Sequence, residues 1–201
     1  MSAERSIMFG AAGVRAILAG TKTQTRRTVK PNRYRELPDT PRIECDADDG
    51  LWYCDGGHWM VRCPYGVPGD RLWVRETWAD TMSDPAEAVY RADGERHPSS
   101  SLRWQSPMRM PRWASRITLE VTGVRVERLH QISAKDILAE GAVIRAHIDQ
   151  FGRNPVSAFD GCVYLDLMSL WAAGWDKINR KRAPWESNPW VWVIEFKRIE
   201  P

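Results

Sequence analysis

The alternation of apolar and polar positions predicts a chain built mainly from β-strands. Alternating or β-branched residues fall in five segments: residues 7–9, 21–29, 71–78, 116–127 and 190–199. The segment 116–127 is the longest of them. Because alternation with a period of two turns one face of a strand to a core, we expect a sheet at the centre of the fold.

Helical spacing of apolar residues predicts three helices around that sheet. Residues 14–18 form a short early helix, which Gly20 ends as a left-handed cap. A capping box at Ser133 begins a second helix, and Gly141 ends it. Residues 160–175 carry their apolar side chains on one helical face, which is typical of a longer amphipathic helix.

This order of elements predicts an α+β fold, in the form of a small PUA-like mixed β-barrel with peripheral helices. Residues 31–62 and 80–110 are polar and rich in turn-forming residues, so we interpret them as two long loop insertions, with a short hairpin near residues 88–92. A chain of 201 residues can bury one continuous core. We therefore treat residues 1–201 as a single domain.

Composition narrows the function classes only a little. The net charge of +3 is too small to indicate a nucleic-acid-binding protein by itself. Arginine outnumbers lysine and there are 11 tryptophans, residue types that suit phosphates and base stacking but also ordinary packing. No apolar run is long enough to span a membrane, and no signal-peptide core is evident. We expect a cytoplasmic protein with reduced thiols, monomeric and without a membrane partner.

The segment 20–27 carries the first candidate chemistry, because it places Lys22 three residues before Thr25 and next to Arg26 and Arg27. Neighbouring positive charge and burial both push a lysine toward its neutral form. A neutral lysine can take the proton of a threonine hydroxyl and make it a nucleophile. The alternative is a solvated basic strand, and spacing alone favours that alternative.

Two further positions are candidates for a site. Arg75, Glu76 and Trp78 lie at a strand end, where they could line a ligand pocket or form an ordinary edge ion pair with a rim tryptophan. Glu140 lies in the last helical turn before Gly141, where a carboxylate opposes the helix dipole. That placement favours a role such as anchoring a lysine, although a solvent-facing glutamate is the common alternative.

Cys45, Cys54, His58 and Cys63 supply ligand types that zinc prefers. Their spacing does not match a close-paired zinc motif, so no metal site is predicted. No glycine-rich nucleotide loop is present either, and we expect no cofactor.

Several segments together resemble the ASCH superfamily, whose fold is PUA-like. The helix and Gly-x-Lys-Thr motif within residues 14–27, the Gly-Asp turn of 68–74, the strand 117–126, the Glu-Gly helix end of 132–141 and the strand 190–199 carry this resemblance. They cover about two-thirds of the chain by motif-level comparison. The chain looks most similar to the larger members found in phages and prophages.

The resemblance implies a mechanism. Small bacterial members of the superfamily remove acetyl from 4-acetylcytidine with a lysine, a threonine and a glutamate, which would correspond here to Lys22, Thr25 and Glu140. Arg26 or Arg27 would then stabilise the oxyanion, while Arg75, Glu76 and Trp78 would bind the substrate.

Three functions follow as predictions. The first is a hydrolase that removes an acyl group from an N-acylated cytidine-like nucleoside or base. The second is a non-catalytic module that binds RNA or a modified nucleic acid, with RNA expected over DNA. The third is a metal-independent ribonuclease. The two insertions distinguish the chain from the small amidohydrolases.

Overall fold

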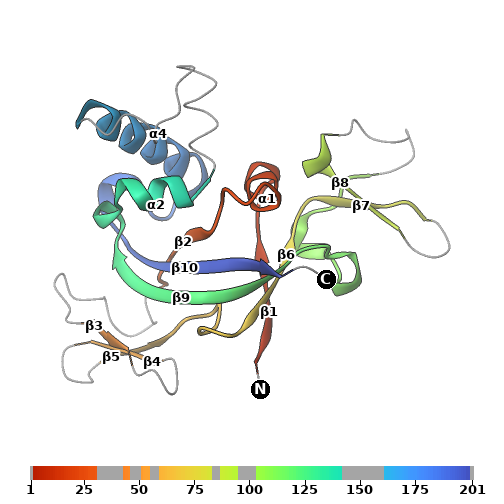
Figure 1. The fold of residues 1–201 in the computed structure, drawn as a ribbon, viewed down its shortest axis with the longest axis horizontal. Helices are drawn as coiled ribbons and strands as arrows, with labels where there is room; N and C mark the ends of the chain where they lie inside the picture. Colours follow the sequence, from red (N-terminus) through yellow and green to blue (C-terminus); the bar gives the residue numbers. More distant parts are fainter. Residues whose placement is uncertain are drawn as a thin grey trace.

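A five-stranded mixed sheet forms the centre of the protein, in a computed structural model that describes residues 2–30, 43–45, 51–54, 59–82, 87–94, 103–141 and 161–199 (Figure 1). The strands are ordered β1 (Glu4–Met8), β6 (Arg71–Arg75), β9 (Thr118–Arg128), β10 (Trp190–Ile199) and β2 (Gln24–Thr28). β1 and β6 run parallel, and the other neighbours are antiparallel. The predicted α+β class is confirmed.

The sheet is open in the described part of the chain, where no backbone ladder joins the outer strands β1 and β2. Instead, Nη2 of Arg27 on β2 donates to the carbonyl oxygen of Met8 on β1 over 2.6 Å. A side chain thus bridges the edges that a closed barrel would join through the main chain. β10 also changes register between Glu195 and Phe196, a bulge that helps the long strands to curve.

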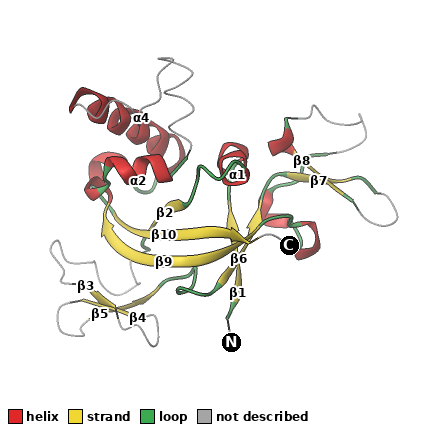
Figure 2. Cartoon of the chain, viewed as in Figure 1, coloured by secondary structure: helices red, strands yellow, loops and turns green. Residues whose placement is uncertain are grey.

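Alternate residues of β10 pack against different helices, which are red in Figure 2. Trp192 and Ile194 join the core formed with α1 (Ala11–Leu18) and β1. Val191 and Val193 point the other way and pack with α2 (Ala134–Ala139) and α4 (Gly161–Asn179). Because alternate residues of a strand face opposite sides, β10 separates these two apolar clusters.

Parts of both predicted insertions contain regular structure. β3 (Ile43–Cys45), β4 (Leu51–Cys54) and β5 (Trp59–Arg62) form an antiparallel sheet within the first insertion, which corrects the expectation of irregular structure there. β7 (Trp78–Asp80) pairs with β8 (Ala88–Tyr90) in the second insertion, close to the predicted hairpin. The described 3-10 helices are η1 (Arg91–Asp93), η2 (Pro107–Arg109), η3 (Arg112–Ala114), η4 (Leu129–Gln131) and η6 (Trp185–Ser187).

The predicted capping box is confirmed at the start of α2. The Ser133 hydroxyl accepts from the Asp136 amide over 3.2 Å, and the Asp136 carboxylate accepts from the Ser133 amide over 3.0 Å. This box fixes the start of the helix whose other end carries Glu140. Among the described residues, no helix has both the length and the apolar character needed to cross a membrane.

Candidate functional site

Lys22 lies where the carboxyl ends of two helices meet. Gly20 adopts a left-handed φ of 71° after α1, and the Lys22 amide then donates to the carbonyl oxygen of Ala16 over 3.1 Å. From the other side, the Thr23 amide donates to the carbonyl oxygen of Ala139 in α2 over 2.9 Å. Because the carboxyl ends of helices carry partial negative charge, this position favours a cation.

The structure brings Lys22 and Glu140 together across 118 residues of chain. Nζ of Lys22 donates to Oε2 of Glu140 over 2.6 Å and to its carbonyl oxygen over 2.9 Å. Both residues are only 7% exposed. The second carboxylate oxygen, Oε1, accepts from Nη1 of Arg26 over 3.4 Å. One buried carboxylate therefore links two cations.

Burial lowers the pKa of Lys22, because the charged ammonium loses its water. Glu140 opposes this shift, whereas the charges of Arg27 and Arg26 add to it. The net direction of the Lys22 pKa shift is downward, because burial is the largest of these effects. A lowered pKa enlarges the neutral fraction of the amine, which is the form that can accept a proton.

Thr25 lies on the face of β2 that is turned toward the core around α1. It is paired with Ile194 of β10, which belongs to that core. The Phe9 ring of the same core has Nζ of Lys22 5.8 Å from its centroid and the guanidinium carbon of Arg27 5.1 Å away. Nζ of Lys22 and the face of β2 that carries Thr25 therefore both border the core that contains Phe9. No hydrogen bond within the described residues uses the Thr25 hydroxyl.

Arg26 points to the opposite face of β2 and is committed to carboxylates. Its side chain is 1% exposed and pairs with Glu127, with Asp136 at 3.4 Å and with Glu140. The two predicted oxyanion-stabilising residues therefore differ. Arg26 is held in an ion-pair network, whereas Arg27 is half-buried on the Thr25 face of the strand.

The three residues predicted to bind substrate contact neither Lys22 nor Glu140 within the described part of the chain: Arg75, Glu76 and Trp78. The Glu76 carboxylate is 1% exposed and accepts from Nε of Arg116 over 2.9 Å. Burial raises its pKa, an effect that Arg116 opposes. These contacts make Glu76 part of an interior ion pair.

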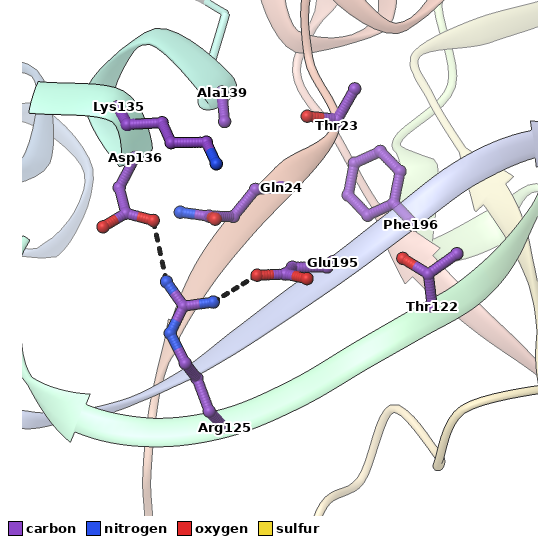
Figure 3. A pocket seen from close by; sticks show the side chains of 9 residues that line it. All are labelled: Thr23, Gln24, Thr122, Arg125, Lys135, Asp136, Ala139, Glu195 and Phe196. Carbon is purple, nitrogen blue, oxygen red and sulfur yellow. Dashed lines mark hydrogen bonds and ion pairs between the residues drawn. The ribbon is translucent and has the colours of Figure 1, made fainter. Parts of the chain in front are cut away.

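A pocket of about 470 Å³ lies between α2, β2 and the long strands, and its lining includes none of Lys22, Thr25 and Glu140 (Figure 3). Thr23 and Ala139, the chain neighbours of the pair, belong to its wall. The full set of lining residues is Thr23, Gln24, Thr122, Arg125, Lys135, Asp136, Ala139, Glu195 and Phe196. Two acids and two bases give this pocket no net formal charge, and the Phe196 ring adds an apolar surface. Such a pocket suits a neutral polar ligand with one flat face.

An ion-pair network spans one side of this pocket. Arg125 donates to Asp136 over 2.7 Å and also pairs with Glu195 (Figure 3). The Gln24 side chain, 3% exposed, extends toward the carboxylate of Asp136. Sequence reasoning missed these residues. Gln24, Arg125 and Glu195 lie on three different predicted strands, and nothing in the sequence paired those strands or placed Asp136 of α2 beside them.

Of the four candidate zinc ligands, Cys45, Cys54, His58 and Cys63, the structure describes the side chain of Cys63. Cys63 is 1% exposed within the core around β1, and burial raises the pKa of its thiol to about 11. The side chains of Cys45 and Cys54, and all of His58, lie outside the described residues. Among the described residues, no group of three or more potential ligands could hold a metal ion.

Comparison with known proteins gave a single result. Models of protein families, curated proteins and solved structures yielded no match to this chain. The resemblance to the ASCH superfamily therefore stays a prediction from the sequence motifs.

Proposed function

We propose that the protein is an ASCH-type hydrolase with a PUA-like fold, which removes an acyl group from an N-acylated cytidine-like nucleoside or base. The observation that carries this proposal is the buried pair of Lys22 and Glu140, which lie 118 residues apart and 2.6 Å from each other. The pKa of Lys22 is lowered, and the neighbouring strand presents Thr25. A covalent hydrolase needs such a general base and such a nucleophile.

In the proposed reaction, neutral Lys22 accepts the hydroxyl proton of Thr25 as Oγ1 attacks the acyl carbonyl carbon. The tetrahedral oxyanion is stabilised by Arg27, which lies on the same face of β2. The C–N bond then breaks, and Lys22 returns the proton to the leaving amine. Glu140 keeps the ammonium of Lys22 oriented while it carries that proton.

The acyl group is now an ester of Thr25. Water attacks this ester and gives one proton to Lys22, which passes it to Oγ1 as the carboxylic acid leaves. The enzyme returns to its starting state with the acyl group released and the amine free.

Thr25 offers the sharpest test, because serine keeps the hydroxyl and valine keeps the shape of the side chain without it. Purified wild-type protein, Thr25→Ser and Thr25→Val are incubated with 4-acetylcytidine, and deacetylation is followed by absorbance. We expect turnover with wild type, partial activity with serine and a loss of about a hundred-fold or more with valine. Turnover by the valine variant at the wild-type rate would remove Thr25 as the nucleophile.

The two remaining functions make different predictions in the same assay. A metal-independent ribonuclease cleaves RNA in the presence of chelator and leaves 4-acetylcytidine intact. A non-catalytic module turns over neither substrate. An inactive wild-type protein with a native circular dichroism spectrum would therefore end the hydrolase proposal.

A further inference from the structure

A second pocket lies between β7 and the segment that leads into η2. Its volume is about 650 Å³, and the residues that line it define the arginine–tryptophan groove: Asp80, Thr81, Met82, Arg103, Trp104, Gln105, Ser106 and Arg109. Figure 1 shows β7 on the other side of α1 from α2. The groove is thus separate from the Lys22–Glu140 pair, and none of the functions considered above assigns it a role.

The floor of the groove is held by the main chain and by a small apolar cluster. Trp78 and Gln105 exchange backbone hydrogen bonds, the shorter over 2.7 Å. Trp78 is 3% exposed and packs with Met110 and Ala114. The Tyr90 hydroxyl secures this cluster by donating to the Ala114 carbonyl oxygen over 2.8 Å. The groove is therefore preformed, which reduces the cost of binding.

Basic residues outnumber acidic ones around the groove, whose lining holds two arginines and one aspartate. Residues 96–119 contain five arginines and neither aspartate nor glutamate. Of these, Arg112 pairs with Glu4, and Arg116 pairs with Glu76 and Asp93. Arg103 and Arg109 line the groove, are exposed, and have no carboxylate partner within the part of the chain that the structure describes. Two guanidinium groups without an ion-pair partner thus line one concavity, together with the single carboxylate of Asp80.

Large apolar side chains gather at the same place. Three of the most exposed described residues lie here: Met82 at 84%, Met108 at 70% and Trp113 at 52%. The Trp113 ring is nearly perpendicular to that of Trp78, with the ring centroids 5.7 Å apart, and about half of Trp113 is open to solvent. Trp104 provides a second indole in the wall of the groove. Apolar exposure of this kind marks an interaction site.

We propose that the arginine–tryptophan groove binds a single strand of nucleic acid. Arg103 and Arg109 contact successive phosphates, and bases stack on Trp104 and on the exposed ring of Trp113. Free guanidinium groups match the phosphate backbone, while indole rings match unstacked bases, and this combination is typical of single-strand binding. An acidic peptide would satisfy the arginines but would not use the exposed ring of Trp113 for stacking. The proposal is independent of the hydrolase activity.

Fluorescence anisotropy tests this proposal with labelled oligouridylate and oligothymidylate across a range of salt concentrations. We expect wild-type protein to bind at least one of them, with an affinity that falls as salt rises. Arg103→Ala/Arg109→Ala should weaken binding about ten-fold and flatten the salt dependence by about 1.4 logarithmic units per decade. Trp113→Ala should weaken it about five-fold with the salt dependence unchanged.

A charge-matched control comes from the other end of the molecule. Arg180 and Lys181 are exposed beyond α4, so Arg180→Ala/Lys181→Ala removes the same charge without touching the groove. The proposal requires this variant to bind like wild type. Equal losses in both double variants would show non-specific attraction and overturn it. Binding to anionic vesicles without binding to either oligonucleotide would overturn it as well, as would the absence of binding at low salt.

Discussion

Lys22 and Glu140 form a buried ion pair in which the two partners are not equivalent. Lys22 has one carboxylate within reach, at 2.6 Å, whereas Glu140 also accepts from Arg26 at 3.4 Å. Removal of the carboxylate therefore leaves an ammonium without a counter-charge in the interior. Removal of the ammonium leaves the carboxylate with one cation.

This asymmetry predicts unequal losses of stability. Glu140→Gln should lower the free energy of unfolding by about 3 kcal/mol, because it strands a buried charge. Lys22→Met should cost less, since Glu140 keeps Arg26 as a partner. Urea unfolding monitored by tryptophan fluorescence measures both variants. A larger loss of unfolding free energy for Lys22→Met than for Glu140→Gln would contradict the interpretation that Lys22 and Arg26 share the Glu140 carboxylate.

The pH dependence of Glu140→Gln gives a second readout. Burial already lowers the folded-state pKa of Lys22, and the loss of Glu140 lowers it further. The unfolded chain then binds more protons than the folded one below the ordinary lysine pKa of about 10.4. Stability of the variant should therefore rise with pH toward that value, and its deficit relative to wild type should shrink. A deficit that is constant with pH would assign the loss to packing.

The sequence predicted the part of this site that is local or that follows from family-like motifs. Residues 20–25 and the Glu-Gly helix end pointed to Lys22 and Glu140, and the structure brings those two side chains together. Gly20 and Gly141 both take the left-handed conformation expected of helix ends. These features depend on short stretches of chain, which a single sequence can specify.

The partners of Arg26 could not be predicted in the same way. It lies 101 residues from Glu127 and 114 from Glu140, and the pairing of β2 with β10 decides which face of the strand it occupies. Glu76 shows the same limit. Its position at a strand end was compatible with a ligand pocket, but its carboxylate is buried and forms an ion pair with Arg116. Strand order and register are non-local, so the residue pattern alone left them open.

Asp136 predicts a loss of stability in acid. Burial alone would raise its pKa, but hydrogen bonds from Ser133 and the charge of Arg26 lower it from 3.8 to about 2. A lowered carboxyl pKa stabilises the fold above the unfolded value, and this stabilisation is lost as the pH falls from about 4 toward 2. Asp136→Asn should therefore cost about 1 kcal/mol near neutral pH, after allowance for solvent screening.

The difference between wild type and Asp136→Asn should shrink on acidification, as measured by urea unfolding at a series of pH values. Glu186→Gln is the matched control, because Glu186 is exposed. Its difference from wild type should be small at every pH. A difference for Asp136→Asn that stays constant into acid would show that the hydrogen bonds, and not the charge, carry the effect.

Cys63 should be an inert thiol. Its pKa is raised from 9.0 to about 11, which reduces the reactive thiolate about a hundred-fold at neutral to mildly basic pH. Alkylation of Cys63 by iodoacetamide, followed by peptide mass mapping, should be slow in the native protein and fast in urea. Addition of a chelator to the native protein should not change the rate. Faster alkylation with chelator would instead indicate a metal-bound thiolate.

Gly141 controls how closely α2 approaches Lys22. It has a φ of 73°, and a Cβ atom there would lie 2.7 Å from Cβ of Lys22 and 3.0 Å from its Cα. Gly20 has nearly the same φ, 71°, but a Cβ atom there would meet nothing within 4 Å. The two glycines thus share the same backbone strain and differ in the space around them.

Gly20→Ala should cost about 1 kcal/mol of unfolding free energy, which is the left-handed strain alone. Gly141→Ala should cost clearly more, because its Cβ atom collides with main-chain atoms of Lys22 that cannot rotate away. Chemical denaturation gives the two values, and the 4-acetylcytidine assay should show a rate loss with Gly141→Ala alone, since the clash displaces Lys22 from Glu140. Equal costs for the two substitutions would mean that Lys22 is not held against the end of α2.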